Sequence, residues 1–134
     1  MKPEVQNKIT LYKFFVESLN YQCDNYNKVN SSDQMDIELG VASSFSNDNL
    51  KSYLIKIIVN IKMKNNDFKL DCEAVGQFST SEDIDDEFKD SHFVKINSPA
   101  ILFPFVRSYI NTMTTNSGLT PIILPAFNFS NLHD

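Results

Sequence analysis

The stretch SPAILFPFVRSYINTM, residues 98 to 113, decides the fold of this chain, because it predicts one long helix that is apolar on more than one side. Asn97 or Ser98 is expected to cap the helix, and Pro99 suits the first turn, where no amide hydrogen is needed. Gly118 is expected to end it. The apolar side chains are Ala100, Ile101, Leu102, Phe103, Phe105, Val106, Tyr109, Ile110 and Met113. They spread beyond one stripe, so we expect this helix to pack against its own sheet on one side and against a second copy of the chain on the other.

Four β-strands are expected before this helix, at residues 8–22, 34–42, 51–64 and from 68 onward. Apolar and polar residues alternate in the last three, as is typical of strands with one buried face. Phe14, Phe15 and Val16 break the alternation of the first strand, which predicts a β-bulge or a strand covered on both faces. The links between strands are short or polar and hold no crossover helix. We therefore expect an antiparallel sheet in an α+β fold, with a single domain over residues 1–134.

The connecting segments carry signals of their own. Residues 64–67, KNND, predict a tight turn. The acidic run 82–90 holds the whole net charge of −5 and predicts a short solvated helix with Ile84 and Phe88 pointing inward. Beyond the long helix, two prolines in the apolar segment LTPIILPAFNF favour an extended tail over a second helix.

Several classes of function are excluded by the composition and the motifs. No basic stripe is present, which argues against nucleic-acid binding, and no apolar run is long enough to span a membrane. The only histidines, His92 and His133, are expected to be solvated or satisfied rather than catalytic or metal-binding. The acidic run resembles the start of a calcium loop, but Phe88 stands where that loop needs glycine. We therefore expect a binding protein and not an enzyme, with no catalytic residue, no metal and no cofactor.

The cytoplasm is the compartment that the sequence favours. Cys23 and Cys72 form no spaced pair, so we expect reduced thiols, with Cys72 filling an apolar strand face. The first residues, MKPEVQNK, contain no apolar stretch of the kind that a secretory leader needs.

The helix and the tail together resemble a known family. Residues 98–129, SPAILFPFVRSYINTMTTNSGLTPIILPAFNF, resemble the signature of the SecB protein-export chaperones: an N/S-P-x-I-L-F-P-[FY]-x-R helix start, a later glycine, and an L-P-x-x-N-F tail. Pro104 makes this signature specific, because a proline inside a helix is costly and unrelated folds would rarely repeat it. The strand segments 36–64 and 70–79 resemble the same family in order, length and spacing. The resemblance covers about residues 8–132.

The resemblance implies a function and an assembly. It implies ATP-independent holding of unfolded polypeptides in long apolar grooves, which keeps preproteins competent for export. It also implies a homotetramer built as a dimer of dimers, in which first strands pair across one interface and the long helices lie between two sheets. Such a fold and assembly would account for a helix that is apolar on two sides.

The sequence also departs from the family pattern. SecB proteins carry a second helix after the tail motif, and because this sequence ends at Asp134 we expect that helix to be absent. Glu73 matches one acid of the patch that SecB offers to the SecA motor. Ser18 and Gln22 stand where first-strand acids are expected, and Asp71 replaces an apolar neighbour. The sequence therefore leaves open whether SecA is a partner. A chaperone dedicated to one antitoxin of a toxin–antitoxin system is an alternative, as is a small oligomeric interaction protein without clients.

Two sets of residues are the candidate sites. The client-binding candidates are the apolar residues of the first link, the second strand and the tail: Tyr26, Val29, Met35, Ile37, Leu39, Phe127 and Phe129. The candidates for the subunit interface are residues of the first strand and one stripe of the helix: Phe14, Val16, Leu102, Phe105, Val106, Tyr109 and Met113.

Overall fold

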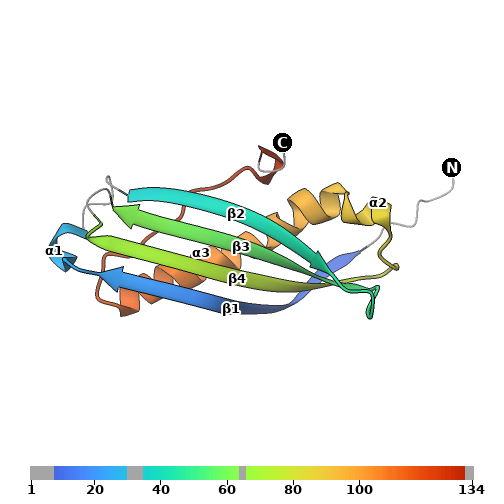
Figure 1. Ribbon diagram of the computed structural model, residues 1–134, viewed down its shortest axis with the longest axis horizontal. Helices are drawn as coiled ribbons and strands as arrows, with labels where there is room; N and C mark the ends of the chain where they lie inside the picture. The colour runs from blue at the N-terminus through green and yellow to red at the C-terminus, as the bar shows by residue number, and fades with distance from the viewer. Residues whose placement is uncertain (1–7, 30–34, 64–65, 132–134) are drawn as a thin grey trace.

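A four-stranded antiparallel sheet with one long helix across one of its faces makes up the protein (Figure 1). The computed structural model describes residues 8–29, 35–63 and 66–131. The strands are β1 (Ile9–Cys23), β2 (Met35–Phe45), β3 (Ser52–Met63) and β4 (Phe68–Thr80). They lie in the order β1-β4-β3-β2, and every neighbouring pair is antiparallel. The expected α+β fold is confirmed.

The helices follow the sheet, apart from one short helix in the first link. They are α1 (Tyr26–Val29), α2 (Asp86–Lys89), the π-helix η2 (Phe93–Asn97), the long α3 (Ser98–Asn116) and the 3-10 turn η3 (Phe129–Asn131). In Figure 1, α3 crosses behind the sheet, and the chain after it also runs on that side. We call the sheet face that α3 covers the inner face and the opposite one the outer face.

The two central strands put their apolar residues on the inner face, as their alternation predicts. The buried side chains of β3 are Tyr53, Ile55, Ile57, Val59, Ile61 and Met63. Those of β4 on the same face are Phe68, Leu70, Cys72, Ala74 and Phe78. The core of the protein therefore lies between these strands, α3 and the tail.

Strand β1 contains two bulges, which confirms the prediction made from its broken alternation. The pairing register with β4 shifts between Leu11 and Lys13 and again between Val16 and Ser18. Each extra residue returns an apolar side chain to the inner face, so that Leu19 stands opposite the buried Cys72. The two bulges therefore account for the broken alternation of this strand.

Helix α3 packs closely on the sheet where it passes Gly76 of β4. A methyl group at Gly76 would lie 2.7 Å from Cδ1 of Leu102 and 3.0 Å from Cδ1 of Leu11, so only glycine leaves room for this approach. Apart from Ser98 and Pro99 in its first turn, the buried side chains of α3 are Leu102, Phe103, Val106, Ile110 and Thr114. This stripe includes Phe103 and Ile110 and leaves Phe105 exposed, so the core-facing side is rotated from the stripe that runs from Leu102 through Phe105 to Met113.

The start of α3 differs from the predicted cap. The π-helix η2 runs directly into α3, and both Asn97 and Ser98 have helical backbone angles, so neither residue caps the helix. The hydroxyl of Tyr53 instead donates to Oγ of Ser98 at 2.7 Å, and Ser98 Oγ donates in turn to the carbonyl oxygen of Phe93. Burial raises the pKa of Tyr53 from 10.0 to about 12. This chain of hydrogen bonds ties the helix junction to β3.

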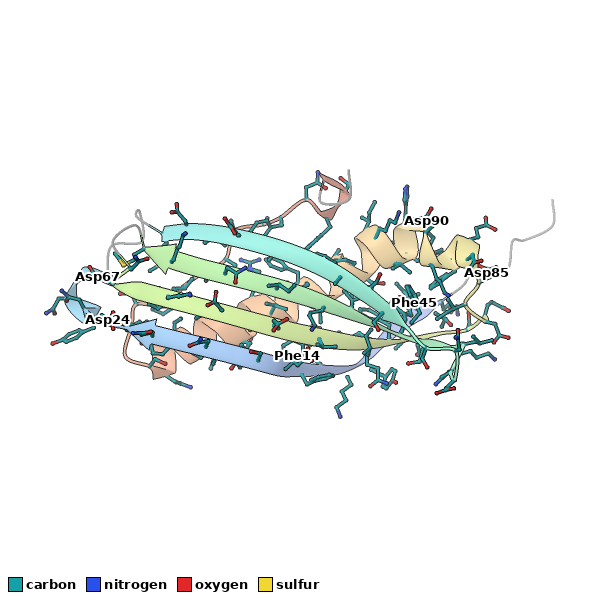
Figure 2. All side chains as sticks on the ribbon, in the orientation of Figure 1. Phe14, Asp24, Phe45, Asp67, Asp85 and Asp90 are labelled. Atoms are coloured by element: carbon teal, nitrogen blue, oxygen red, sulfur yellow. The ribbon has the colours of Figure 1, made fainter. Side chains whose placement is uncertain are left out.

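An aromatic cluster fixes the short helices to one end of the sheet, where Figure 2 shows Phe45. The Tyr53 ring stacks on Phe78 with centroids 5.3 Å apart and meets Phe88 of α2 edge-on at 5.6 Å. Asp85 caps α2 by accepting from the amide of Phe88 at 2.7 Å. The burial of Phe88, and of Ile84 before it, confirms the prediction of a short helix with two inward side chains.

The segment after α3 returns along the inner face as an extended tail, as its prolines predict. Gly118 has φ of +87°, the left-handed conformation expected of the residue that ends a helix. The amide of Ile122 then donates to Oγ1 of Thr114 at 3.0 Å, and both Ile122 and Leu124 are buried. In Figure 1 the tail emerges past β2 before it reaches η3.

Candidate functional surfaces

The outer face carries a shallow apolar hollow crossed by an ion-pair network. The hollow has a volume of about 410 Å³, and Phe15, Leu54, Ile58 and Val75 are its larger apolar residues. Across it, Nζ of Lys56 lies 2.8 Å from Oε2 of Glu17 and 3.4 Å from Oε1 of Glu73. These bonds, led by the one to Glu17, raise the pKa of Lys56. The single positive charge of Lys56 is thus shared between two carboxylates, and it offsets only part of their negative charge.

On the inner side, the exposed edge of α3 is apolar. Phe105 has 49% of its surface exposed and Ile101 has 39%. The Phe105 ring lies 5.9 Å from the ring of Phe14 on β1, and the inward-facing Leu19 is also exposed. We call Phe14, Leu19, Ile101, Phe105, Tyr109 and Met113 the helix strip; Phe14, Tyr109 and Met113 are half-buried. Desolvation by this partial burial, with a smaller contribution from Cys72, raises the pKa of Tyr109.

The residues predicted for a subunit interface divide into two groups. Phe14, Phe105, Tyr109 and Met113 lie in the helix strip, and Val16 is half-buried. Leu102 and Val106 have no exposed surface, so they form part of the core of the chain itself and cannot add contact area to an interface. The physical reason is the rotation of α3 described above. Leu19 and Ile101 were missed, although Ile101 lies four residues before Phe105 and therefore on the same side of the helix.

The candidate client-binding residues lie along β2, the tail and α1. Met35, Ile37 and Leu39 point to the inner face and are half-buried, as is Phe127 of the tail. Phe129 is 5% exposed and packs edge-on against Phe103 at 5.6 Å, which makes it a core residue in this structure.

The other two client candidates lie in the first link. Tyr26 is 66% exposed at the start of α1. Val29 closes α1, and its side chain lies outside the described part of the chain. Sequence reasoning missed Ile123, which is 67% exposed beside α3 in a hollow lined by Arg107 and Asn111.

In the part of the chain that the structure describes, the titratable groups form no metal site. Within the described ranges, no three His, Cys, Asp or Glu residues gather as metal ligands. His92 is exposed, and His133 lies outside the described residues. Cys23 and Cys72 are both free thiols, and burial raises the pKa of Cys72 from 9.0 to about 11, which keeps it an unreactive neutral thiol at ordinary pH. Among the helices described, none is long and apolar enough to cross a membrane.

Comparison with known proteins shows the family of this chain. The family model described as preprotein translocase subunit SecB matches residues 2–134. The chain belongs to the SecB family. The resemblance drawn from the helix and tail motif is thereby confirmed.

Proteins with similar sequences share part or most of this chain. The SecB of Sphingopyxis alaskensis is 27% identical over 128 residues, which are 92% of this chain and 73% of that protein. The SecB of Anaplasma phagocytophilum is 35% identical over half of this chain and 43% of its own length. An uncharacterized protein of Methanocaldococcus jannaschii is 41% identical over 47% of this chain and 39% of its own length. The matched region thus spans less than half of two of these three relatives.

Solved structures share the fold at low sequence identity. The SecB-like chaperone Rv1957 of Mycobacterium tuberculosis, solved with a peptide from the HigA1 antitoxin, superposes with a TM-score of 0.70 at 16% identity, over 90% of this chain and 88% of that one. A Streptococcus agalactiae protein of unknown function superposes with a TM-score of 0.54 at 13% identity, over 91% of this chain and all of the other. At these identities the likeness establishes the SecB-like fold.

Proposed function

We propose that this SecB-family chain is an ATP-independent holdase, a chaperone that binds non-native polypeptides through apolar surface and keeps them from aggregating. The observation that supports it most strongly is the apolar surface outside the helix strip: Ile123 is 67% exposed, and the inward-facing apolar residues of β2 are only half-buried. Burying one such side chain contributes about 1.5–3 kcal/mol. A few of them therefore suffice to hold an unfolded segment without a catalytic group or a nucleotide.

The clients would bind along β2 and the tail, with Tyr26 extending the surface at α1. Met35, Ile37, Leu39 and Phe127 present half-buried apolar surface there. Phe129 is left out of this surface because Phe103 covers it. Extended segments suit such a row, because alternate side chains of a strand point to the same side.

Assembly into a homotetramer, as a dimer of dimers, is part of the proposal. The helix strip would lie between two copies, and the exposed edge of β1 would pair with a second β1. Both features leave apolar or backbone polar groups at the surface of the single chain, which a second copy would cover. The cytoplasm is the proposed compartment, in keeping with the two free thiols.

A chaperone dedicated to one antitoxin is the second candidate. Two observations favour it over an export chaperone that works with SecA. Ser18 and Gln22 are exposed where acids were expected, and Lys56 pairs with both Glu17 and Glu73. The acidic surface that would attract SecA is therefore reduced. The SecB-like fold is also the fold of a chaperone solved with an antitoxin peptide.

Aggregation assays distinguish these candidates. The protein is added, without ATP, to several unrelated polypeptides diluted from urea and, separately, to any antitoxin found encoded beside its gene. Suppression of aggregation for most clients supports the general holdase, and protection of the antitoxin alone supports the dedicated one. If light scattering by every client is unchanged at a molar excess of the protein, client binding is rejected and a purely structural role remains.

A further inference from the structure

Helix α3 and the tail after it carry a single charged side chain. In the sequence, residues 98–131 contain no acid and one cation, Arg107. The negative net charge of the chain therefore arises entirely outside this segment. A polypeptide that packs on the exposed side of α3 and the tail meets one guanidinium among uncharged side chains.

Arg107 is exposed and has no partner of its own in the part of the chain that the structure describes. Its side chain forms no ion pair, hydrogen bond or ring contact there. Lys56, Lys69, Lys89 and Lys95, by contrast, each pair with at least one carboxylate. The donors of Arg107 are therefore open to a ligand, and a carboxylate is the group that their planar fork fits well.

Arg107 borders a shallow hollow between α3 and the tail. The hollow has a volume of about 300 Å³ and is lined by Arg107, Ser108 and Asn111 of the helix and by Ile123 and Leu124 of the tail. Ile123 is 67% exposed beside it. One short segment of polypeptide can therefore reach a cation and a large apolar side chain at the same time.

The tail holds Ile123 in place. Its neighbours Ile122 and Leu124 are buried, and the amide of Ile122 donates to Oγ1 of Thr114 at 3.0 Å. Pro125 follows Leu124, and a proline favours extended backbone in the residue before it. Because Ile123 stands on an anchored segment, a ligand that covers it loses little affinity to ordering of the tail.

We propose that this hollow binds a carboxylate of the client, with Arg107 as its anchor and Ile123 as the adjacent apolar contact. This inference rests on the proposed holdase function and names the kind of segment that the hollow selects: an aspartate or glutamate next to a large apolar residue. The preference runs against the field of the whole molecule, because a net charge of −5 repels acidic segments. It is therefore a local property of Arg107.

The test compares three unstructured peptides that carry glutamate, glutamine or lysine between two leucines in a serine–glycine background. Fluorescence anisotropy measures their affinities at physiological ionic strength, where charges more than about 8 Å apart are largely screened. We expect the glutamate peptide to bind about threefold more tightly than the glutamine peptide, and the lysine peptide no more tightly than the glutamine peptide. Equal affinities for the glutamate and glutamine peptides, or no binding of the glutamate peptide, would overturn the proposal.

Variants of the hollow assign the preference to its residues. Arg107→Gln should abolish the preference for glutamate and leave the affinity for the glutamine peptide unchanged, whereas Ile123→Ser should weaken the binding of both peptides. Lys62→Gln is the matched control, because it removes an exposed cation from the outer face and should keep the preference. A preference for glutamate that persists in Arg107→Gln would show that the carboxylate binds elsewhere, and the proposal would be wrong.

The mass of the assembly separates a client site from a contact between subunits. Arg107→Gln should keep the mass of the parent protein in light scattering. A smaller mass would show that Arg107 meets a second copy of the chain, which would overturn the proposal. Suppression of aggregation by a protein that shows no preference for glutamate would leave the holdase function standing and reject this inference alone.

Discussion

At the junction of η2 and α3, a single serine connects three elements. Ser98 is fully buried, and its hydroxyl accepts from Tyr53 of β3 and donates to the carbonyl of Phe93. A proline follows it and has no amide hydrogen to continue the helical pattern. The backbone amide and the side-chain hydroxyl of Ser98 both donate to the carbonyl oxygen of Phe93, and these bonds fix the turn at which α3 begins.

Removing the hydroxyl of Ser98 and removing that of Tyr53 should lower the free energy of unfolding by different amounts. Ser98→Ala leaves the buried Tyr53 hydroxyl without its partner, so the free energy of unfolding should fall by about 1–3 kcal/mol. Tyr53→Phe removes one bond but leaves Ser98 bonded to Phe93, and should cost about 1 kcal/mol. Urea denaturation of both variants measures these losses. A larger loss of stability for Tyr53→Phe than for Ser98→Ala would contradict the order in which Tyr53 donates to Ser98 and Ser98 donates to Phe93.

Gly76 and Gly40 form a matched pair of substitutions. Gly76→Ala places a methyl group 2.7 Å from Leu102 at the closest approach of α3, and should lower the free energy of unfolding by about 1–3 kcal/mol through overpacking. Gly40→Ala meets nothing nearer than Cβ of Ile58 at 3.8 Å, so the melting temperature should stay constant or rise slightly. Equal melting temperatures for the two variants would contradict the close packing at Gly76.

Alkaline pH should destabilise the fold by ionising two buried side chains, the thiol of Cys72 and the hydroxyl of Tyr53. The pKa of Cys72 is raised to about 11 and that of Tyr53 to about 12, because burial favours their neutral forms. Their contribution to stability is complete below their unfolded values of 9.0 and 10.0 and is lost as the pH rises through the folded values. Melting curves across this range should show the loss, and Cys72→Ala should remove the part that begins near pH 9.0. If the melting temperatures of the parent and of Cys72→Ala fall equally with pH, ionisation of Cys72 is not a cause of the loss.

The strands and the long helix were predictable from the sequence, but the side of each element that is buried was only partly predictable. Alternation located β2, β3 and β4 because each buries one face, and the broken alternation of β1 located its bulges. The periodicity of α3 could not tell which apolar side faces the core, because its apolar residues cover more than one side. The choice depends on Gly76 and on the tail, whose contacts with Phe103 are tertiary. Leu102 and Val106 were therefore assigned to the interface, and Phe129 to the client surface, when all three are buried.

Helix α3 carries the prediction on assembly. Phe105→Asp places a charge in the centre of the helix strip, where a second copy would bury it at a cost of several kcal/mol. We expect light scattering to report a smaller assembly than for the parent protein. Asn111→Asp is the matched control, because it adds the same charge on the side of α3 that faces Ile123, away from the helix strip. If both variants keep the parent mass, the helix strip is not the interface.

The molecule as a whole combines a SecB-like fold with apolar surfaces that remain exposed on the single chain. The sheet and α3 bury one core, while the helix strip, the half-buried apolar residues of β2 and the exposed Ile123 remain accessible. On the outer face, Lys56 offsets part of the negative charge of Glu17 and Glu73. These features support a protein that binds polypeptide by apolar area, assembles through α3 and β1, and has a reduced attraction for SecA.

The most direct test of holdase activity is the formation of a complex with an unfolded client. A slowly refolding protein is diluted from urea into the chaperone without nucleotide, and the mixture is passed over a sizing column with in-line light scattering. The account predicts that the client elutes with the chaperone as a complex of defined mass and that Ile123→Asp weakens this complex while the melting temperature is unchanged. A client that elutes alone or aggregates as fast as it does without the chaperone would contradict the central claim.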